Sequence, residues 1–182
     1  MRTVEDKILV AYATRYGSTR EVAEVVGATM REQGLTVDVM PVKDVADLGG
    51  YHGVVLGTPF YLGSILKDAA AFLERHHTAL EVLPVALLAL GPTQATDDMT
   101  EARKQLDGPL AKLEWLNPVA AEMFVGKYDP AHLRLLDRLI ALPPASPLHG
   151  VGAHDERDWD AIRSWAMGLP AALELAQAAP VR

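Results

Sequence analysis

Three hydroxyl side chains gather around one glycine near the beginning of the chain. Thr14, Ser18 and Thr19 flank Gly17 within the segment Thr14-Arg15-Tyr16-Gly17-Ser18-Thr19. Hydroxyl groups donate hydrogen bonds to anions, and glycine lets the backbone take a positive φ or approach a ligand closely. These residue types and their spacing predict a binding site for one phosphate group. The alternative is that Ser18 or Thr19 only caps a helix.

The segments on both sides of this loop favour the phosphate interpretation. Residues 8–12 form an unbroken apolar run, which is typical of a strand buried on both faces. From about Ser18 to Gln33 the apolar residues follow helical spacing. The first N–H groups of a helix lack partners and carry partial positive charge, so a strand that turns directly into a helix presents an anion site. The loop matches neither GxGxxG nor GxxxxGK[ST].

The rest of the chain alternates between strand and helix patterns with short connections. Further strands are predicted at 35–41, 53–57, 84–90 and 119–125. Further helices are predicted at 65–77, at 99–113 with an interruption at Gly108-Pro109, and at 157–177 with a kink or restart at Pro170. This order predicts one α/β domain over residues 1–182, with a doubly wound, five-stranded parallel sheet of strand order 2-1-3-4-5 and helices on both faces.

Two more loops are expected beside the phosphate loop, because the carboxyl ends of parallel strands share one edge where ligands bind. The loop after the third strand is Thr58-Pro59-Phe60-Tyr61-Leu62-Gly63-Ser64. Large apolar groups on such a loop favour stacking on a flat aromatic ligand. The alternative is that Phe60 or Leu62 packs into the core.

The loop after the fourth strand begins Gly91-Pro92-Thr93-Gln94. It offers backbone N–H groups, one hydroxyl and one amide, which suit the polar edge of a flat ring. Asp97 and Asp98 follow, and they either lie near that ring or only start a helix.

Composition narrows the classes of function. The chain has no cysteine, so thiolate chemistry and disulfides are excluded and redox chemistry needs a bound cofactor. A net charge of -7 argues against a nucleic-acid partner and suits a partner protein with a basic patch. The sequence shows no apolar run long enough for a bilayer and begins too polar for a signal peptide, so a cytoplasmic location is expected. The histidines predict no metal site, and no catalytic residue is assigned.

From about Lys7 to Val125 the chain resembles the flavodoxin-like superfamily, whose phosphate loop reads T-x-x-G-x-T. Flavodoxins are themselves the standard example of strand order 2-1-3-4-5. The resemblance implies FMN, with its phosphate in the first loop and its ring between the other two. The implied cofactor-binding residues are Thr14, Arg15, Tyr16, Gly17, Ser18, Thr19, Thr58, Pro59, Phe60, Tyr61, Leu62, Gly63, Gly91, Pro92 and Thr93.

A narrower resemblance is to the flavodoxin-like menaquinone-dependent protoporphyrinogen IX dehydrogenases. It is carried by ATRYGST, VVLGTPFYLG and GKYDP…LLDRLI…DERDWDAIRSWA. It implies electron transfer from a protoporphyrinogen-like substrate to a quinone, in the cytoplasm or at a membrane periphery. This chain reads Ser64-Ile65-Leu66-Lys67 where that family carries basic and histidine-rich residues. Three roles are open for Arg15: it binds the phosphate, it faces an acidic substrate, or it is only exposed to solvent.

Three alternatives stand beside this function, and one of them, a scaffold that has lost its cofactor, is disfavoured by the intact phosphate loop. Another is an electron-carrier flavodoxin that binds FMN, serves a redox partner protein and has no small-molecule substrate of its own. The third is a phosphorylation receiver, which is disfavoured because Ala11-Tyr12-Ala13 and Leu56-Gly57-Thr58 lack the acidic residues it needs.

Residues 131–142 read AHLRLLDRLIAL and are unusually rich in leucine. Such a segment is either a core helix or a surface helix that meets a second subunit, a quinone or a membrane. Core packing or a homodimer contact is favoured over peripheral membrane contact, because the helix has only two cations.

Overall fold

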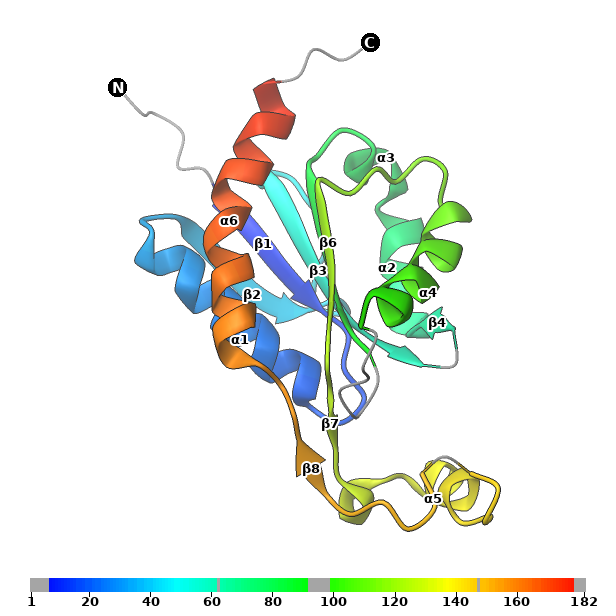
Figure 1. The fold of residues 1–182 in the computed structure, drawn as a ribbon. Coiled ribbons are helices and arrows are strands. Elements are labelled where there is room, and N and C mark those ends of the chain that lie inside the picture. Colours follow the sequence, from blue (N-terminus) through cyan, green and yellow to red (C-terminus); the bar gives the residue numbers. More distant parts are fainter. Residues whose placement is uncertain (1–6, 62, 92–98, 147, 179–182) are drawn as a thin grey trace.

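The computed structural model describes residues 7–61, 63–91, 99–146 and 148–178 (Figure 1). Five parallel strands form the sheet: β1 Lys7–Tyr12, β2 Thr36–Pro41, β3 Gly53–Tyr61, β5 Val85–Leu90 and β6 Ala120–Phe124. Their spatial order is β2-β1-β3-β5-β6, and the short β4 (Ser64–Ile65) pairs only with β3. The predicted order 2-1-3-4-5 is therefore confirmed.

The apolar runs of the sequence explain the central strands. β5 is buried along its whole length, and β1 is buried from Ile8 to Ala11. β3 lies between them, pairing with β1 from Ile8↔Gly53 and with β5 from Val54↔Val85. Because strands covered on both faces lose alternation, a continuous apolar run is the pattern they require.

Helices cover both faces of the sheet, as predicted (Figure 1). On one face, α1 (Ser18–Glu32) and α6 (Trp159–Ala178) bury Val22, Val26, Ile162 and Leu169 against β1 and β3. On the other face lie α2 (Lys67–Arg75), α3 (His77–Leu80) and α4 (Met99–Ala111). The two layers hold the sheet so that its strands end together at one edge.

The third strand is longer than the sequence pattern indicates. It was predicted to end at residue 57, but β3 continues to Tyr61 and turns back into β4 through the pairs Phe60↔Ile65 and Tyr61↔Ser64. Proline is more common in turns than inside strands, so Pro59 does not indicate a continuing strand. Here Pro59 lies near the end of the strand, opposite Leu90, where proline is tolerated.

Three helices also differ from the prediction, one in its first residue and two in their continuity. The helix expected at 65–77 begins at Lys67, because residues 64–65 belong to β4. α4 runs through Gly108 and Pro109 without interruption, and α6 is not restarted at Pro170. Leu169 and Leu173 are buried on either side of Pro170, so tertiary packing holds α6 together across the missing hydrogen bond.

Residues 127–155 form a projecting lobe beyond the carboxyl edge of the sheet (Figure 1). Two short antiparallel strands, β7 (Lys127–Tyr128) and β8 (His154–Asp155), make its stalk. Beyond the stalk lie the 3-10 turn η1 (Pro130–His132) and the helix α5 (Leu135–Ala141).

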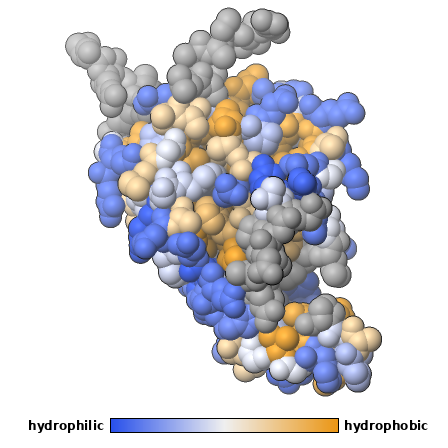
Figure 2. Space-filling model, viewed as in Figure 1, coloured by the Kyte–Doolittle hydropathy of each residue, from blue (hydrophilic) through white to orange (hydrophobic). Residues whose placement is uncertain are grey.

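The apolar side chains of this lobe are exposed. Leu135 is 74% exposed, Leu136 70% and Ile140 60%, and Leu139 and Leu142 are also exposed. Figure 2 shows apolar surface on the projecting lobe. The expectation that residues 131–142 pack into the core is therefore wrong, whereas the surface-helix alternative agrees with the structure.

Candidate cofactor site

The predicted phosphate loop lies between the end of β1 and the start of α1, as expected. Gly17 is the N-cap residue of α1, with φ of 89°. A Cβ at Gly17 would meet nothing within 4 Å, so the positive φ is what favours glycine here. The Gly17 N–H donates to Thr14 Oγ1 at 2.9 Å, which fixes the turn and leaves the Thr14 hydroxyl proton free to donate outward.

Two buried polar atoms of this loop have no hydrogen-bond partner in the structure. They are Thr19 Oγ1 and Arg15 Nε. Thr19 is fully buried, and burial of an unpaired polar group costs about 1–3 kcal/mol. No side chain caps α1 at Gly17, and neither Ser18 nor Thr19 occupies the N-cap position. The helix-cap alternative is therefore wrong, and the free donors fit the oxygens of a phosphate.

The projecting lobe contacts this loop directly. Arg15 Nη2 donates to Asp137 Oδ1 at 2.9 Å, and the Tyr16 hydroxyl donates to Asp137 Oδ2. The backbone N–H of Arg134 donates to the same hydroxyl at 3.3 Å. Burial, followed by the hydrogen bond to Asp137, raises the pKa of Tyr16, so its phenol keeps the proton it donates.

This contact settles one of the alternatives for Arg15, because a side chain ion-paired with α5 is not merely solvated. Asp137 was not among the site residues predicted from the sequence. In the sequence it is one carboxylate within a leucine-rich segment, and such an acidic residue is usually exposed to solvent.

The segment predicted as the ring-binding loop begins inside β3 and is buried there. Thr58 is buried, and its hydroxyl donates to Pro59 O at 3.1 Å and accepts from the Leu66 N–H at 3.3 Å. Phe60 packs against Ala89 and Leu106, so its ring lies in the core, as the alternative prediction for this residue stated.

Other parts of that segment stay predictions as cofactor contacts. Gly63 takes a φ of 76° at the β3–β4 turn, and Leu62 lies outside the described residues. The parts played by Thr58, Pro59 and Tyr61 toward a ligand are untested by the geometry.

At the third loop the structure describes Gly91 but not its neighbours. Gly91 is buried, and its N–H donates to Phe124 O at 2.8 Å. A Cβ there would lie 2.5 Å from Met123 Sδ, so glycine allows β5 to end closely packed against β6. Pro92, Thr93, Asp97 and Asp98 lie outside the described residues, and their predicted contacts stay predictions.

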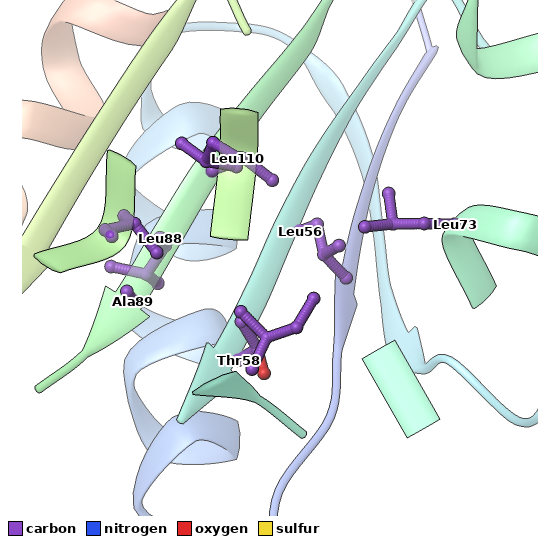
Figure 3. Close-up of a pocket in the computed structure, with 9 residues that line it drawn as sticks. Leu56, Thr58, Leu73, Leu88, Ala89 and Leu110 are labelled. Carbon is purple, nitrogen blue, oxygen red and sulfur yellow. The ribbon is translucent and has the colours of Figure 1, made fainter. Parts of the chain in front are cut away.

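Two cavities are lined by residues outside the phosphate loop. Figure 3 shows one of about 10 Å³ between the sheet and the α2–α4 layer, with Leu56, Leu73, Leu88 and Leu110 around it. This volume is at the lower limit for a single water, so the cavity is a packing defect. An open hollow of about 500 Å³ lies beside β4, α2 and α4 and includes Trp115.

Comparison with known proteins identifies the family. Residues 9–141 match the family model of the flavodoxin domain. The chain belongs to the flavodoxin domain family. Members of the flavodoxin family bind a flavin, typically FMN, at the switch point between the first and third strands of the sheet. In this flavodoxin domain, that switch point lies between β1 and β3, next to Gly17 and Thr19.

Two kinds of curated relatives are about 30% identical to this flavodoxin domain over aligned stretches that cover less than half of each relative. An NAD(P)H dehydrogenase (quinone) of Cupriavidus metallidurans is 34% identical over 91 residues, covering 38% of this chain and 46% of the relative. A protoporphyrinogen IX dehydrogenase [quinone] of Escherichia coli K12 is 29% identical over 86 residues, covering 46% of this chain and 48% of the relative. The chain thus spans about half the length of the curated relatives it matches.

Solved flavodoxins share the fold over nearly their whole length. A flavodoxin from the domain Archaea superposes with a TM-score of 0.56 at 13% identity, covering 92% of this chain and 99% of that one. Flavodoxin 1 from Bacillus cereus superposes with a TM-score of 0.54 at 15% identity, covering 93% and 97%. At these identities the likeness concerns the fold alone.

Proposed function

We propose that this chain is an FMN-binding oxidoreductase that passes electrons between a reduced, protoporphyrinogen-like substrate and a quinone or other acceptor. The observation that carries this proposal is the pair of buried, unpartnered atoms Thr19 Oγ1 and Arg15 Nε beside the uncapped N-terminus of α1. A phosphate bound there satisfies both atoms and also faces the positive end of the helix dipole.

The residues of the loop divide the work of holding the phosphate. Thr14, Ser18 and Thr19 supply hydroxyl donors, and the first N–H groups of α1 supply backbone donors. FMN supplies the electron transfer, which the side chains of a chain without cysteine do not provide. The segments at Thr58–Gly63 and Gly91–Thr93 stay our prediction for the ring site.

The names of the relatives support a quinone as electron acceptor more strongly than they support any particular electron donor. Both kinds of relatives are quinone dehydrogenases, but one is named for NAD(P)H and the other for protoporphyrinogen IX. A porphyrinogen with carboxylate side chains needs cations to bind it, and Arg15 already pairs with Asp137. The acceptor is therefore the better supported half of the proposed reaction.

Steady-state turnover tests the proposed function. The FMN-loaded protein is mixed with a reduced donor, either NAD(P)H or a porphyrinogen, and reduction of a water-soluble quinone is followed. We expect quinone-dependent turnover that is lost in the Thr14→Ala, Thr19→Ala double variant when FMN is limiting. An FMN-loaded protein that transfers no electrons to quinone from any of these donors contradicts the proposal.

The second candidate is an electron-carrier flavodoxin without a substrate of its own. Its support is the fold shared with solved flavodoxins over nearly their whole length. This candidate predicts that a redox partner protein reduces the bound cofactor while small donors and quinones do not. The same turnover assay separates the two functions.

The projecting lobe is the proposed contact with a larger partner. Its exposed side chains Leu135, Leu136 and Ile140 suit the interface of a homodimer or the periphery of a membrane. Among the described residues, no helix has the length and apolar character needed to cross a membrane. The cytoplasmic location stays a prediction.

A further inference from the structure

Asp137 joins two parts of the molecule that are far apart in the sequence. Its two carboxylate oxygens accept hydrogen bonds from Arg15 and Tyr16, which lie more than 120 residues earlier in the phosphate loop. The Arg15 and Asp137 side chains are 31% and 22% exposed. At this partial burial a charge-assisted hydrogen bond is stronger than on an open surface.

The geometry of Arg15 shows what this contact does for the loop. Its guanidinium is planar, so fixing Nη2 on Asp137 also fixes the direction of the Nε N–H. That Nε is buried and has no acceptor. A carboxylate in an anion-binding loop would repel a phosphate if its charge were unbalanced, but here Arg15 neutralises it. The Nε N–H of Arg15 is then a hydrogen-bond donor of fixed direction for a phosphate.

We propose that Asp137 is a positioning residue: it holds Arg15 and Tyr16 in the conformation that receives the cofactor phosphate, and cofactor binding in turn fixes α5 against the loop. This inference rests on the proposed function. The competing view is that Asp137 occupies Arg15 in place of the phosphate, and it predicts the opposite change in affinity.

The direct test is Asp137→Asn, which keeps the size of the side chain and removes its charge. Dissociation constants for FMN and for riboflavin, which lacks the phosphate, are measured by flavin fluorescence. We expect the FMN constant to rise about tenfold and the riboflavin constant to stay unchanged. Asp160→Asn is the matched control, because that carboxylate is fully exposed on α6 and 3.6 Å from Arg163.

A double-mutant cycle adds a test of the route. In an Arg15→Gln background, Asp137→Asn is expected to cause no further loss of FMN affinity, because the charge of Asp137 acts through Arg15 and an amide oxygen still accepts the hydrogen bond from Tyr16. If Asp137→Asn does not fold, Tyr16→Phe removes a single hydroxyl from the same contact and is expected to shift FMN affinity in the same direction.

Reciprocity gives a second measurement on the unaltered protein. If Asp137 couples α5 to the phosphate, FMN must protect the amides of residues 135–141 from hydrogen exchange, and riboflavin must not. Asp137→Asn is expected to remove this protection. Equal protection by both flavins, or by neither, overturns the inference.

The outcomes separate the inference from the proposed function. If the wild-type chain prefers FMN over riboflavin and Asp137→Asn leaves the FMN constant unchanged or lowers it, Asp137 does not position the loop, but the proposed function stands. An equal loss of both flavins indicates general structural damage and also overturns the inference. A wild-type chain that binds no FMN overturns both.

Discussion

Thr19 combines complete burial with a hydroxyl that has no partner, which is an unfavourable arrangement in the absence of ligand. Thr19→Val replaces this hydroxyl with a methyl group of similar shape. We expect the unfolding free energy of the cofactor-free protein to rise by about 1 kcal/mol, because an unpaired polar group is removed. FMN affinity is expected to fall at least about tenfold, because a charge-assisted hydrogen bond to the phosphate is lost.

Thr29→Val is the control for this experiment. Thr29 is also a buried threonine of α1, but its hydroxyl donates to Val25 O at 2.9 Å. Denaturant titration and flavin titration of both variants give the comparison. Equal effects of the two substitutions on FMN affinity would show that Thr19 has no special part in the site.

The burial of His76 leads us to expect that the unfolding free energy falls on acidification. His76 is 8% exposed, and Arg75 Nε donates to its Nε2 at 3.2 Å. Burial, followed by the charge of Arg75, lowers the pKa of His76. The unfolded state then binds more protons below its ordinary pKa of about 6.5, so the unfolding free energy falls as the pH drops below that value.

Urea titrations at about pH 7.5 and about pH 5.5, on either side of the ordinary histidine pKa, measure this effect. His76→Gln is expected to reduce the difference between the two conditions, whereas His149→Gln, which changes an exposed histidine, leaves it as in the wild type. A difference that survives in His76→Gln would assign the pH dependence to other groups.

Arg157 links two elements, α1 and β8, at the N-terminus of α1. Its guanidinium pairs with Glu21 of α1 at 2.7 Å and with Asp155 of β8 at 2.5 Å, and it donates to Ser18 O at 3.3 Å. The side chain is 2% exposed, and the hydrogen bond from Arg157 is the main cause that lowers the pKa of Asp155. This cluster holds the stalk of the projecting lobe against the phosphate loop.

Arg157→Ala therefore removes the contacts between α1 and β8, which are far apart in the sequence and meet only in the fold. Because both carboxylates are partly exposed, we expect a loss of about 2 kcal/mol in unfolding free energy, below the range of about 3–5 kcal/mol for a fully buried pair. The melting temperature is expected to fall by about 6 °C. Arg163→Ala, which removes an exposed arginine of α6, is expected to change it by less than about 2 °C. Equal shifts would show that the buried cluster contributes nothing special.

Hydrophobic periodicity predicted the alternation of strands and helices, and the sheet order followed from matching that alternation to the known doubly wound pattern of flavodoxins. Periodicity failed at elements whose cause is tertiary. Pro59 is a turn signal in most chains, yet β3 continues through it because β5 and β4 pair on either side. The two-residue strands β7 and β8 carry no period of their own, and Arg157 reads as a solvated residue among acidic neighbours until the fold buries it.

The candidate site was predictable to the same extent. The strand, turn and helix around Gly17 follow from local sequence, so the conformation of this loop was predicted, and its binding of a phosphate stays a prediction. Asp137 lies more than 120 residues away, and no local pattern connects it with Arg15. The ring segments were identified by residue type, and side-chain burial, which sequence does not give, decided the position of Phe60.

The exposed apolar face of α5 is the feature of the whole molecule that most needs a partner. The variant Leu135→Gln, Leu136→Gln, Ile140→Gln is expected to lower self-association or vesicle binding while leaving the melting temperature unchanged, because these side chains contribute little to the core. Sedimentation and vesicle flotation measure the two contacts. Val82→Gln, another exposed apolar residue, is the control. If neither contact occurs in the wild type, the lobe is not a docking surface.

The most direct test of the account is a flavin titration of the purified protein. FMN and riboflavin share the ring and the ribityl chain and differ in the phosphate, so their affinity ratio reports the loop from Thr14 to Thr19 alone. We expect FMN to bind at least about tenfold more tightly than riboflavin, and the Thr14→Ala, Thr19→Ala double variant to abolish that preference. Equal affinity for the two flavins, or binding of neither, would contradict the phosphate site on which the proposed function rests.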